Sequence, residues 1–284
     1  MSPDWGAVVA ARMADEVMPL VRDSVTPLAG YRAPGAEPVP IGTGTLFVVG
    51  ERHFVVTAGH VIKDNEPHFP AGVCGFAVGG LDEVGTRLHP VLLNGDVYRF
   101  EDPQDVAVIA LDSDSAAGLT GRRFLRLTDV VLEPQTVGFG WVVGYPNEYI
   151  REVAGVGKGF DPMTLGSVFR GDDPGTIANF DPTFNFLVDA DRSQLVTMDG
   201  SEPASLPHFL NGISGCAVWQ TWWPGVDRPG AWTSQRVRIV GVQTGYYRKP
   251  QFVKATKWGY VANIIYRQFP NLRTILEMHF GKVF

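Results

Sequence analysis

The sequence predicts an all-β fold, and three observations on the 284-residue chain lead to that prediction. All-β barrels commonly extend over about 200–250 residues as one unit, so the length suits such a fold. The chain contains 33 glycines and 21 prolines, as expected for many short strands joined by turns. Apolar residues make up 45% of the chain, and short runs of them, such as residues 54–58 and 106–111, are typical of buried strands.

The first half is predicted to begin with a helix and continue as strands. Residues 5–22 place apolar side chains at helical spacing with charged residues between them, which indicates an amphipathic helix. We expect this helix to pack across the strands, with docking of a partner protein as the alternative. A linker rich in proline and glycine follows, so residues 1–41 are assigned to the helix and linker. Residues 42–130 are assigned to a first group of strands.

The second half is predicted to form another group of strands over residues 131–261. Residues 151–210 are rich in glycine and aspartate, and we expect long loops there around a single strand at 184–188, in the part that grips a substrate. The tryptophan-rich stretch 222–232 is interpreted as a hairpin that packs on these strands or forms a substrate-binding rim. Two short helices separated by Pro270 are predicted within residues 262–284.

Residues 212–218 (GISGCAV) predict a serine nucleophile on a tight glycine turn. Flanking glycines let the backbone take dihedral angles that other residues resist. Such a turn can aim the N–H groups of Gly212 and Ser214 at one point, where an oxyanion would develop. An ordinary Ser-Gly turn is the alternative interpretation. Cys216 has no comparable turn around it and is interpreted as a small buried apolar residue.

Two upstream segments carry residues that suit a serine nucleophile. Residues 54–60 (FVVTAGH) end a strand at His60, where a general base would have a rigid support. Residues 105–111 (DVAVIAL) begin a buried strand with Asp105, whose carboxylate could orient the imidazole and stabilise its protonated form. Each has a plain alternative: a surface histidine in a turn, and an aspartate that completes the polar loop at 101–104. The ordered set of His, Asp and Ser at strand ends favours catalysis.

These three blocks resemble the signature blocks of chymotrypsin-like (trypsin-fold) serine peptidases, most closely the bacterial trypsin-like peptidase domains that are not secreted. The resemblance runs from about residue 42 to about residue 261 and is specific at the three blocks only. Residues 42–48 (GTGTLFV) look like the family's first barrel strand, and residues 239–245 (IVGVQTG) like the strand that lines the specificity pocket.

The resemblance implies two antiparallel six-stranded β-barrels, over residues 42–130 and 131–261, with the active site between them. It implies a serine endopeptidase that cleaves protein or peptide substrates without a metal or cofactor. It implies a catalytic triad of His60, Asp105 and Ser214, and an oxyanion hole formed by the Gly212 and Ser214 amides. It also implies a specificity pocket with His208 at its base and a wall formed by Gln243, Thr244 and Gly245. None of these is acidic, so we expect a neutral or acidic residue, rather than Lys or Arg, before the cleaved bond.

One departure from the family concerns activation. Secreted members carry an aspartate before the nucleophile, which pairs with a new N-terminus released by cleavage, whereas this chain has Ile213 there. We therefore expect activity without N-terminal processing, and narrow specificity or gating by a regulatory partner.

Charge and cysteine content limit the other classes of function. The net charge is −6 and no run of Lys or Arg exceeds two, so no nucleic-acid-binding footprint is expected. No secretory signal, membrane span or zinc-ligand spacing is recognised. The only cysteines, Cys74 and Cys216, are expected to be free thiols in a cytoplasmic protein.

Two other functions are alternatives to a serine endopeptidase. A trypsin-fold binding module that no longer cleaves would keep the cleft and dock a protein partner, and one sequence does not exclude it. An α/β-hydrolase esterase is disfavoured, because its chain order is Ser, acid, His and a helix follows its nucleophile.

Overall fold

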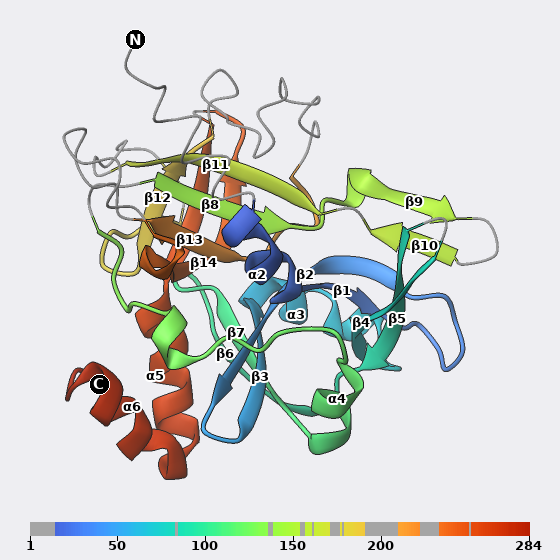
Figure 1. Cartoon of the computed structure of the whole chain (residues 1–284), viewed down its shortest axis with the longest axis horizontal. Coiled ribbons are helices and arrows are strands. Elements are labelled where there is room, and N and C mark those ends of the chain that lie inside the picture. The colour runs from blue at the N-terminus through green and yellow to red at the C-terminus, as the bar shows by residue number, and fades with distance from the viewer. Residues whose placement is uncertain are drawn as a thin grey trace.

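The computed structural model of the protein describes residues 15–82, 85–135, 139–153, 157–160, 162–170, 177, 179–190, 210–221, 233–249 and 251–284. These residues form two antiparallel β-structures, one above the other in Figure 1, joined by segments that cross between them.

The first sheet is built from seven strands, in the order β5-β4-β1-β2-β3-β7-β6. Their bounds are β1 (Val25–Gly30), β2 (Val39–Val49), β3 (Arg52–Ala58), β4 (Val73–Asp82), β5 (Gly85–Leu92), β6 (Gly95–Phe100) and β7 (Val106–Leu111). The predicted barrel had six strands and began at residue 42. The sheet has one strand more, because β1 lies within residues 1–41, which were assigned to the helix and linker, and β2 also starts there.

The second barrel is closed, in the order β11-β12-β15-β14-β13-β8. Its strands are β8 (Phe139–Gly144), β11 (Met163–Arg170), β12 (Asn185–Asp189), β13 (Ala217–Thr221), β14 (Val237–Tyr247) and β15 (Phe252–Lys257), and the pair β9 (Ile150–Val153) and β10 (Gly157–Phe160) stands beside it. The predicted single strand at 184–188 is therefore incomplete as a description of residues 151–210, since β11 also lies there.

Helices are short and flank the strands. They are α2 (Met18–Asp23), α3 (Gly59–Lys63), α4 (Ser113–Gly118), α5 (Trp258–Gln268) and α6 (Arg273–Phe280), with 3₁₀ turns at Glu66–His68, Leu127–Asp129, Asn147–Tyr149, Ser234–Arg236 and Pro270–Leu272. Helix α2 is the described end of the predicted helix at 5–22, and it buries Met18 and Val21. Two C-terminal helices separated at Pro270 are present as predicted, although α5 begins four residues before 262.

Helix α5 ties the two β-structures together. It follows β15 of the second barrel directly, yet it runs beside the first sheet (Figure 1). The ring of its first residue, Trp258, meets the edge of Phe47 on β2, with centroids 5.3 Å apart. Phe269, at the end of α5, meets Phe54 on β3 at the same centroid distance. These rings belong to the main hydrophobic core, which also contains Trp219 of the second barrel.

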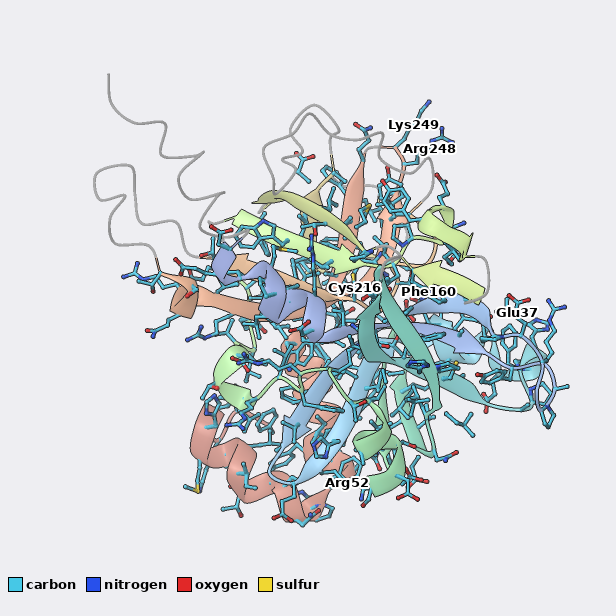
Figure 2. All side chains as sticks on the ribbon, turned by 45° about the vertical axis from the view of Figure 1, so that its right-hand side comes forward. Glu37, Arg52, Phe160, Cys216, Arg248 and Lys249 are labelled. Atoms are coloured by element: carbon cyan, nitrogen blue, oxygen red, sulfur yellow. The ribbon has the colours of Figure 1, made fainter. Side chains whose placement is uncertain are left out.

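The two cysteines are free and buried, as predicted. Cys216 lies in the interior of the molecule, whereas Arg248 and Lys249, at the turn between β14 and β15, project from its surface (Figure 2). Burial raises the pKa of the Cys216 thiol far above its ordinary range, which is unsuitable for a nucleophile. In the described part of the chain, no helix has the length and apolar character needed to cross a membrane.

Candidate active site

His60 and Asp105 meet because β3 and β7 are neighbours in register. Ala58, the last residue of β3, is paired with Val106, the first residue of β7. His60 lies two residues after that pair in α3, and Asp105 lies one residue before it. Both strands bury every side chain near this end, so the two functional residues leave a rigid part of the sheet.

Both carboxylate oxygens of Asp105 contact His60. The backbone N–H of His60 donates to Oδ1 at 2.7 Å, and the ring atom Nδ1 lies 2.7 Å from Oδ2. The backbone of Asp105 is held as well, because its C=O accepts from the Gly59 N–H at 2.9 Å. Asp105 is 7% exposed, and its φ of 46° lies in the left-handed region that few non-glycine residues adopt.

The environment of His60 favours its protonated form. Burial lowers the pKa of the imidazole, but the hydrogen bond and the charge of Asp105 act in the other direction. Asp64 also raises this pKa, while the cation of Lys254 lowers it, and the net result lies above the ordinary value of 6.5. A general base held in this way becomes neutral only at a pH above that value.

Ser214 lies in a tight turn that precedes β13, and the carbonyl groups of the turn are occupied by donors outside it. The Asn147 N–H donates to Asn211 C=O at 2.7 Å, and the Thr43 hydroxyl donates to Gly212 C=O at 2.8 Å. The Thr43 N–H donates to Ser214 C=O at 2.9 Å. Thr43 therefore anchors the turn at two points from β2 of the first sheet.

The N–H groups of Gly212 and Ser214, like that of Asn211, have no backbone acceptor among the described residues. In a trans peptide the N–H points away from the preceding C=O. The Asn211 C=O accepts from Asn147, so the Gly212 N–H points away from Asn147. The Ile213 C=O accepts from Cys216, so the Ser214 N–H points away from the Cys216 N–H. Both N–H groups therefore remain candidates for the predicted oxyanion hole.

The glycines on both sides of Ser214 are needed for close packing. Gly212 and Gly215 have φ of +99° and +95°. A Cβ on Gly215 would lie 2.0 Å from the Thr57 hydroxyl and 2.8 Å from the Ala58 nitrogen. The turn that carries Ser214 therefore touches the end of β3, just before His60. Among the described residues, no hydrogen bond joins the His60 ring to the Ser214 hydroxyl, a link that is often long without a substrate.

The predicted pocket wall lies beside this turn. Gln243 C=O accepts from the Gly215 N–H, and the Gln243 N–H donates to Cys216 C=O, both at 2.8 Å. The next residue, Thr244, lies at an irregularity of β14, and Gly245 follows it. Gln243 Oε1 and Thr244 Oγ1 are buried without a hydrogen-bond partner, so both oxygens remain available as acceptors. His208, the predicted pocket base, lies outside the described residues.

The structure adds residues that the motifs did not indicate. The sequence motifs indicate Thr43 only as part of a strand. Its small neighbours Gly42 and Gly44 are the one local feature that indicates close approach of another backbone segment. Asn185 and Thr256 contact the loop before Asp105, and nothing in their local sequence marks them. Within the described ranges there is no group of three or more side chains suited to hold a metal ion.

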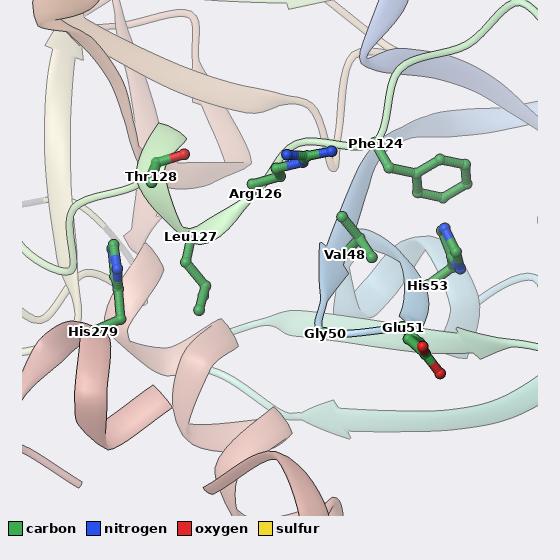
Figure 3. A pocket seen from close by; sticks show the side chains of 9 residues that line it. All are labelled: Val48, Gly50, Glu51, His53, Phe124, Arg126, Leu127, Thr128 and His279. Atoms are coloured by element: carbon green, nitrogen blue, oxygen red, sulfur yellow. The ribbon is translucent and has the colours of Figure 1, made fainter. Parts of the chain in front are cut away.

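A separate groove of about 830 Å³ lies at the opposite end of β3 (Figure 3). It is lined by Val48, His53 and Phe124 from the first sheet and its following loop, and by His279 of α6. Because β3 has seven residues, this groove is roughly 20 Å from His60 along the strand. It therefore does not form part of the candidate site.

No protein-family model and no curated protein sequence matches this chain. Solved structures do resemble it. The inactivated protease paralogue S-I1 of the scabies mite gives a TM-score of 0.53 at 17% identity, over 88% of this chain and 97% of that one. A thermostable serine protease from an extremophilic microorganism gives 0.49 at 12% identity, with 89% and 98% covered. The active form of a Mycobacterium tuberculosis protease gives 0.47 at 17% identity, with 92% and 82% covered. The chain has the trypsin-like fold, as predicted.

Proposed function

We propose that this protein is a serine endopeptidase. Ser214 attacks the carbonyl of a peptide bond, and His60 takes the serine proton and returns it to the leaving amine. Asp105 orients the His60 ring and stabilises its protonated form. The amides of Gly212 and Ser214 bind the oxyanion of the tetrahedral intermediate.

The observation that carries this proposal is the double contact of Asp105 with His60, close to the turn that contains Ser214. One carboxylate oxygen fixes the backbone of His60 and the other fixes its ring, so the imidazole is held in one orientation. An ordinary surface histidine needs neither contact. The N–H groups of Gly212 and Ser214 support the same interpretation, because neither has a backbone acceptor among the described residues and the Asn211 carbonyl accepts from Asn147.

A protein or peptide is the proposed substrate. Two features favour a neutral or acidic side chain before the cleaved bond. The side chain of Lys254 lies beside the pocket strand, since Lys254 pairs with Gly245 across β14 and β15 and its Cε would lie 3.5 Å from a Cβ on Gly245. No acidic residue is among the described members of the predicted wall, which offers oxygen and amide groups instead. We also propose that a protein partner gates the activity, and that the two free thiols reflect a reducing cytoplasm.

A fluorophosphonate probe, which reacts with activated serine nucleophiles, tests the proposal. We expect covalent labelling of the full chain that disappears in Ser214→Ala and persists in Ser113→Ala, a matched change at an exposed serine of α4. Mass spectrometry of the labelled protein should place the adduct on Ser214.

Two observations favour a second function. The His60 ring and the Ser214 hydroxyl are not hydrogen-bonded to each other, and the chain resembles an inactivated protease paralogue of the scabies mite in fold. A silent module that binds a protein partner in the cleft would show no labelling of Ser214 at any pH, although the protein is folded. That outcome would replace the enzyme proposal.

A further inference from the structure

The loop at residues 101–105 delivers Asp105 to His60, and its conformation needs external support. The φ of 46° at Asp105 is unfavourable for a non-glycine residue and persists only where surrounding contacts impose it. Within the first sheet the loop is held at its two ends. The Asp105 N–H donates to Glu101 C=O at 3.1 Å, and the Gly59 N–H donates to Asp105 C=O.

The middle of this loop is held from the second barrel. The side-chain amide of Asn185 donates to Pro103 C=O at 3.0 Å, and the hydroxyl of Thr256 donates to Gln104 C=O. Asn185 and Thr256 face each other across β12 and β15, and their side chains are hydrogen-bonded at 3.1 Å. Both are buried. Two consecutive carbonyls of the loop thus receive donors from one cross-strand pair, which we call the clasp.

A buried cation lies next to the clasp. Lys254 is 3% exposed, and its Nζ donates to the carbonyl of Asn179 at 3.0 Å, while the Asn179 side chain donates to Asp102. Burial lowers the pKa of Lys254, but the charges of Asp105 and Asp102 act against that effect. A buried ammonium is costly unless nearby carboxylates compensate it, and both carboxylates belong to the loop that the clasp holds.

We propose that Asn185 and Thr256 are positioning residues that hold the 101–105 loop so that Asp105 keeps both contacts with His60, and that Lys254 balances the charge of that pair. The consequence for turnover rests on the proposed function. The geometry of the His–Asp pair then depends on the docking of the second barrel against the first sheet, because the clasp and the loop belong to different halves.

The first variant removes one donor from the clasp. Thr256→Val keeps the shape of the side chain but leaves Gln104 C=O without its donor. We expect the pKa of His60 to fall, since Asp105 is the group that raises it, and kcat to fall about ten- to a hundred-fold with KM unchanged. Thr256→Ser should restore both. Thr45→Val is a matched control, because the buried Thr45 hydroxyl has no hydrogen-bond partner.

The second variant removes the cation. Lys254→Met should raise the pKa of His60, because Lys254 is a group that lowers it. The pKa of His60 should thus fall in Thr256→Val and rise in Lys254→Met. A general loss of structure around the site would instead shift this pKa in the same direction in both variants. The ionisable groups that act on this cluster are His60, Asp64, Asp102, Asp105, Tyr247 and Lys254, and only one of them is changed.

The measurement is an NMR titration of histidine-labelled protein, with His60 assigned by its loss in His60→Gln. The titration needs no turnover. A failure of the fluorophosphonate probe to label Ser214 would therefore refute the proposed function without affecting this test. An unmoved His60 pKa in a folded Thr256→Val protein, or shifts in the same direction in both variants, would overturn the proposal. If Thr256→Val does not fold, Asn185→Leu removes the other donor, and the same fall or its absence decides the matter.

Discussion

At single residues, the site depends on atoms that have no room to move. Gly59 is the clearest case. A Cβ at this position would lie 2.9 Å from the Phe100 carbonyl and 3.0 Å from Oδ1 of Asp105. The first contact is with backbone, which cannot turn aside as a flexible side chain does. The second contact is with Oδ1 of Asp105, the oxygen that accepts from the His60 N–H. A Cβ at Gly59 would therefore disturb the contact between Asp105 and His60.

Gly59→Ala should therefore impair the pair more than the fold. We expect kcat to fall about 10- to 100-fold, because Asp105 is displaced from His60. The free energy of unfolding should fall by about 1–3 kcal/mol, the usual cost of overpacking. Gly75→Ala is the matched control, since its Cβ would meet only ordinary contacts at 3.4 Å. Chemical denaturation and ester hydrolysis measure the two effects. Equal activity in the two variants would contradict this argument.

The raised pKa of His60 fixes the sign of the pH dependence. The base must be neutral to accept the serine proton, so kcat/KM should rise with pH through the pKa of His60. The midpoint of this acidic limb should lie above 6.5, because the Asp105 contacts outweigh burial. Asp64→Asn should move the midpoint down, and Asp114→Asn, an exposed acid on α4, should not move it. A midpoint at or below 6.5 on an ester substrate would show that Asp105 does not govern His60.

Sequence patterns located the candidate triad because each member sits where a strand begins or ends. They could not locate the contacts that hold it. The Thr43 hydroxyl meets Gly212 C=O across 169 positions of the chain, and Asn185 meets Pro103 across 82. Such pairs leave no local periodicity. They follow only from how the two halves dock, which a pattern of strands and turns does not specify.

At the level of elements, strand β1 contains a proline and still takes a central position in the first sheet. Pro27 suggested a linker, since proline cannot donate to a ladder and is rare inside sheets. Yet β1 lies between β2 and β4. Its pairing with β4 involves only Ala29 and Gly30, so Pro27 faces no ladder partner on that side. The strand therefore keeps a central position at no cost in hydrogen bonds.

The turn that contains Ser214 is anchored by apolar packing at Ile213. Ile213 is fully buried and belongs to the apolar core of the second barrel. A Cβ on Gly144 of β8 would lie 2.9 Å from the Cβ of Ile213, so the two backbones are in close contact. The turn therefore has no space or partner for a charged group at position 213.

Ile213→Asp should destabilise the protein by about 3–5 kcal/mol, because it buries a carboxylate without a partner. Ile213→Val, which removes one methyl group, should cost about 0.5–1.5 kcal/mol. Thermal and chemical unfolding measure both. A stable Ile213→Asp protein whose activity requires a free α-amino group would show that the turn accepts an ion pair after all.

The strands of the predicted pocket lead to a preference that a peptide library can test. The cation of Lys254 on β15, together with the lack of an acidic residue at the predicted wall positions Gln243, Thr244 and Gly245, disfavours a cationic side chain before the cleaved bond. We expect cleavage in a positional-scanning library to follow neutral or acidic residues. Gln243→Leu should reduce cleavage after polar residues and spare cleavage after apolar ones. Predominant cleavage after Arg or Lys would mean that an acid outside the described residues reaches the pocket.

In the whole molecule, the candidate site lies at the junction of two β-structures that hold each other. Thr43 of the first sheet carries the Ser214 turn of the second half, and the clasp of the second barrel carries the Asp105 loop of the first. Helix α5 then returns from the second barrel to pack on the first sheet. Each half thus supplies support for the other's functional residue, so neither half is expected to form a competent site alone.

Trimming the N-terminus separates activation from stability. Removal of residues 1–14, which lie outside the described part, should leave ester hydrolysis unchanged, because Ile213 offers no carboxylate to a new α-amino group. Removal of residues 1–38 should abolish cooperative unfolding, since it takes away α2 and the central strand β1, with Val25 and Leu28 from the core. Thermal unfolding and hydrolysis of a small ester, measured on both proteins beside the full chain, test the two statements. A large gain in hydrolysis after the shorter trim would identify those residues as an inhibitory segment, and the inference drawn from Ile213 would then fail.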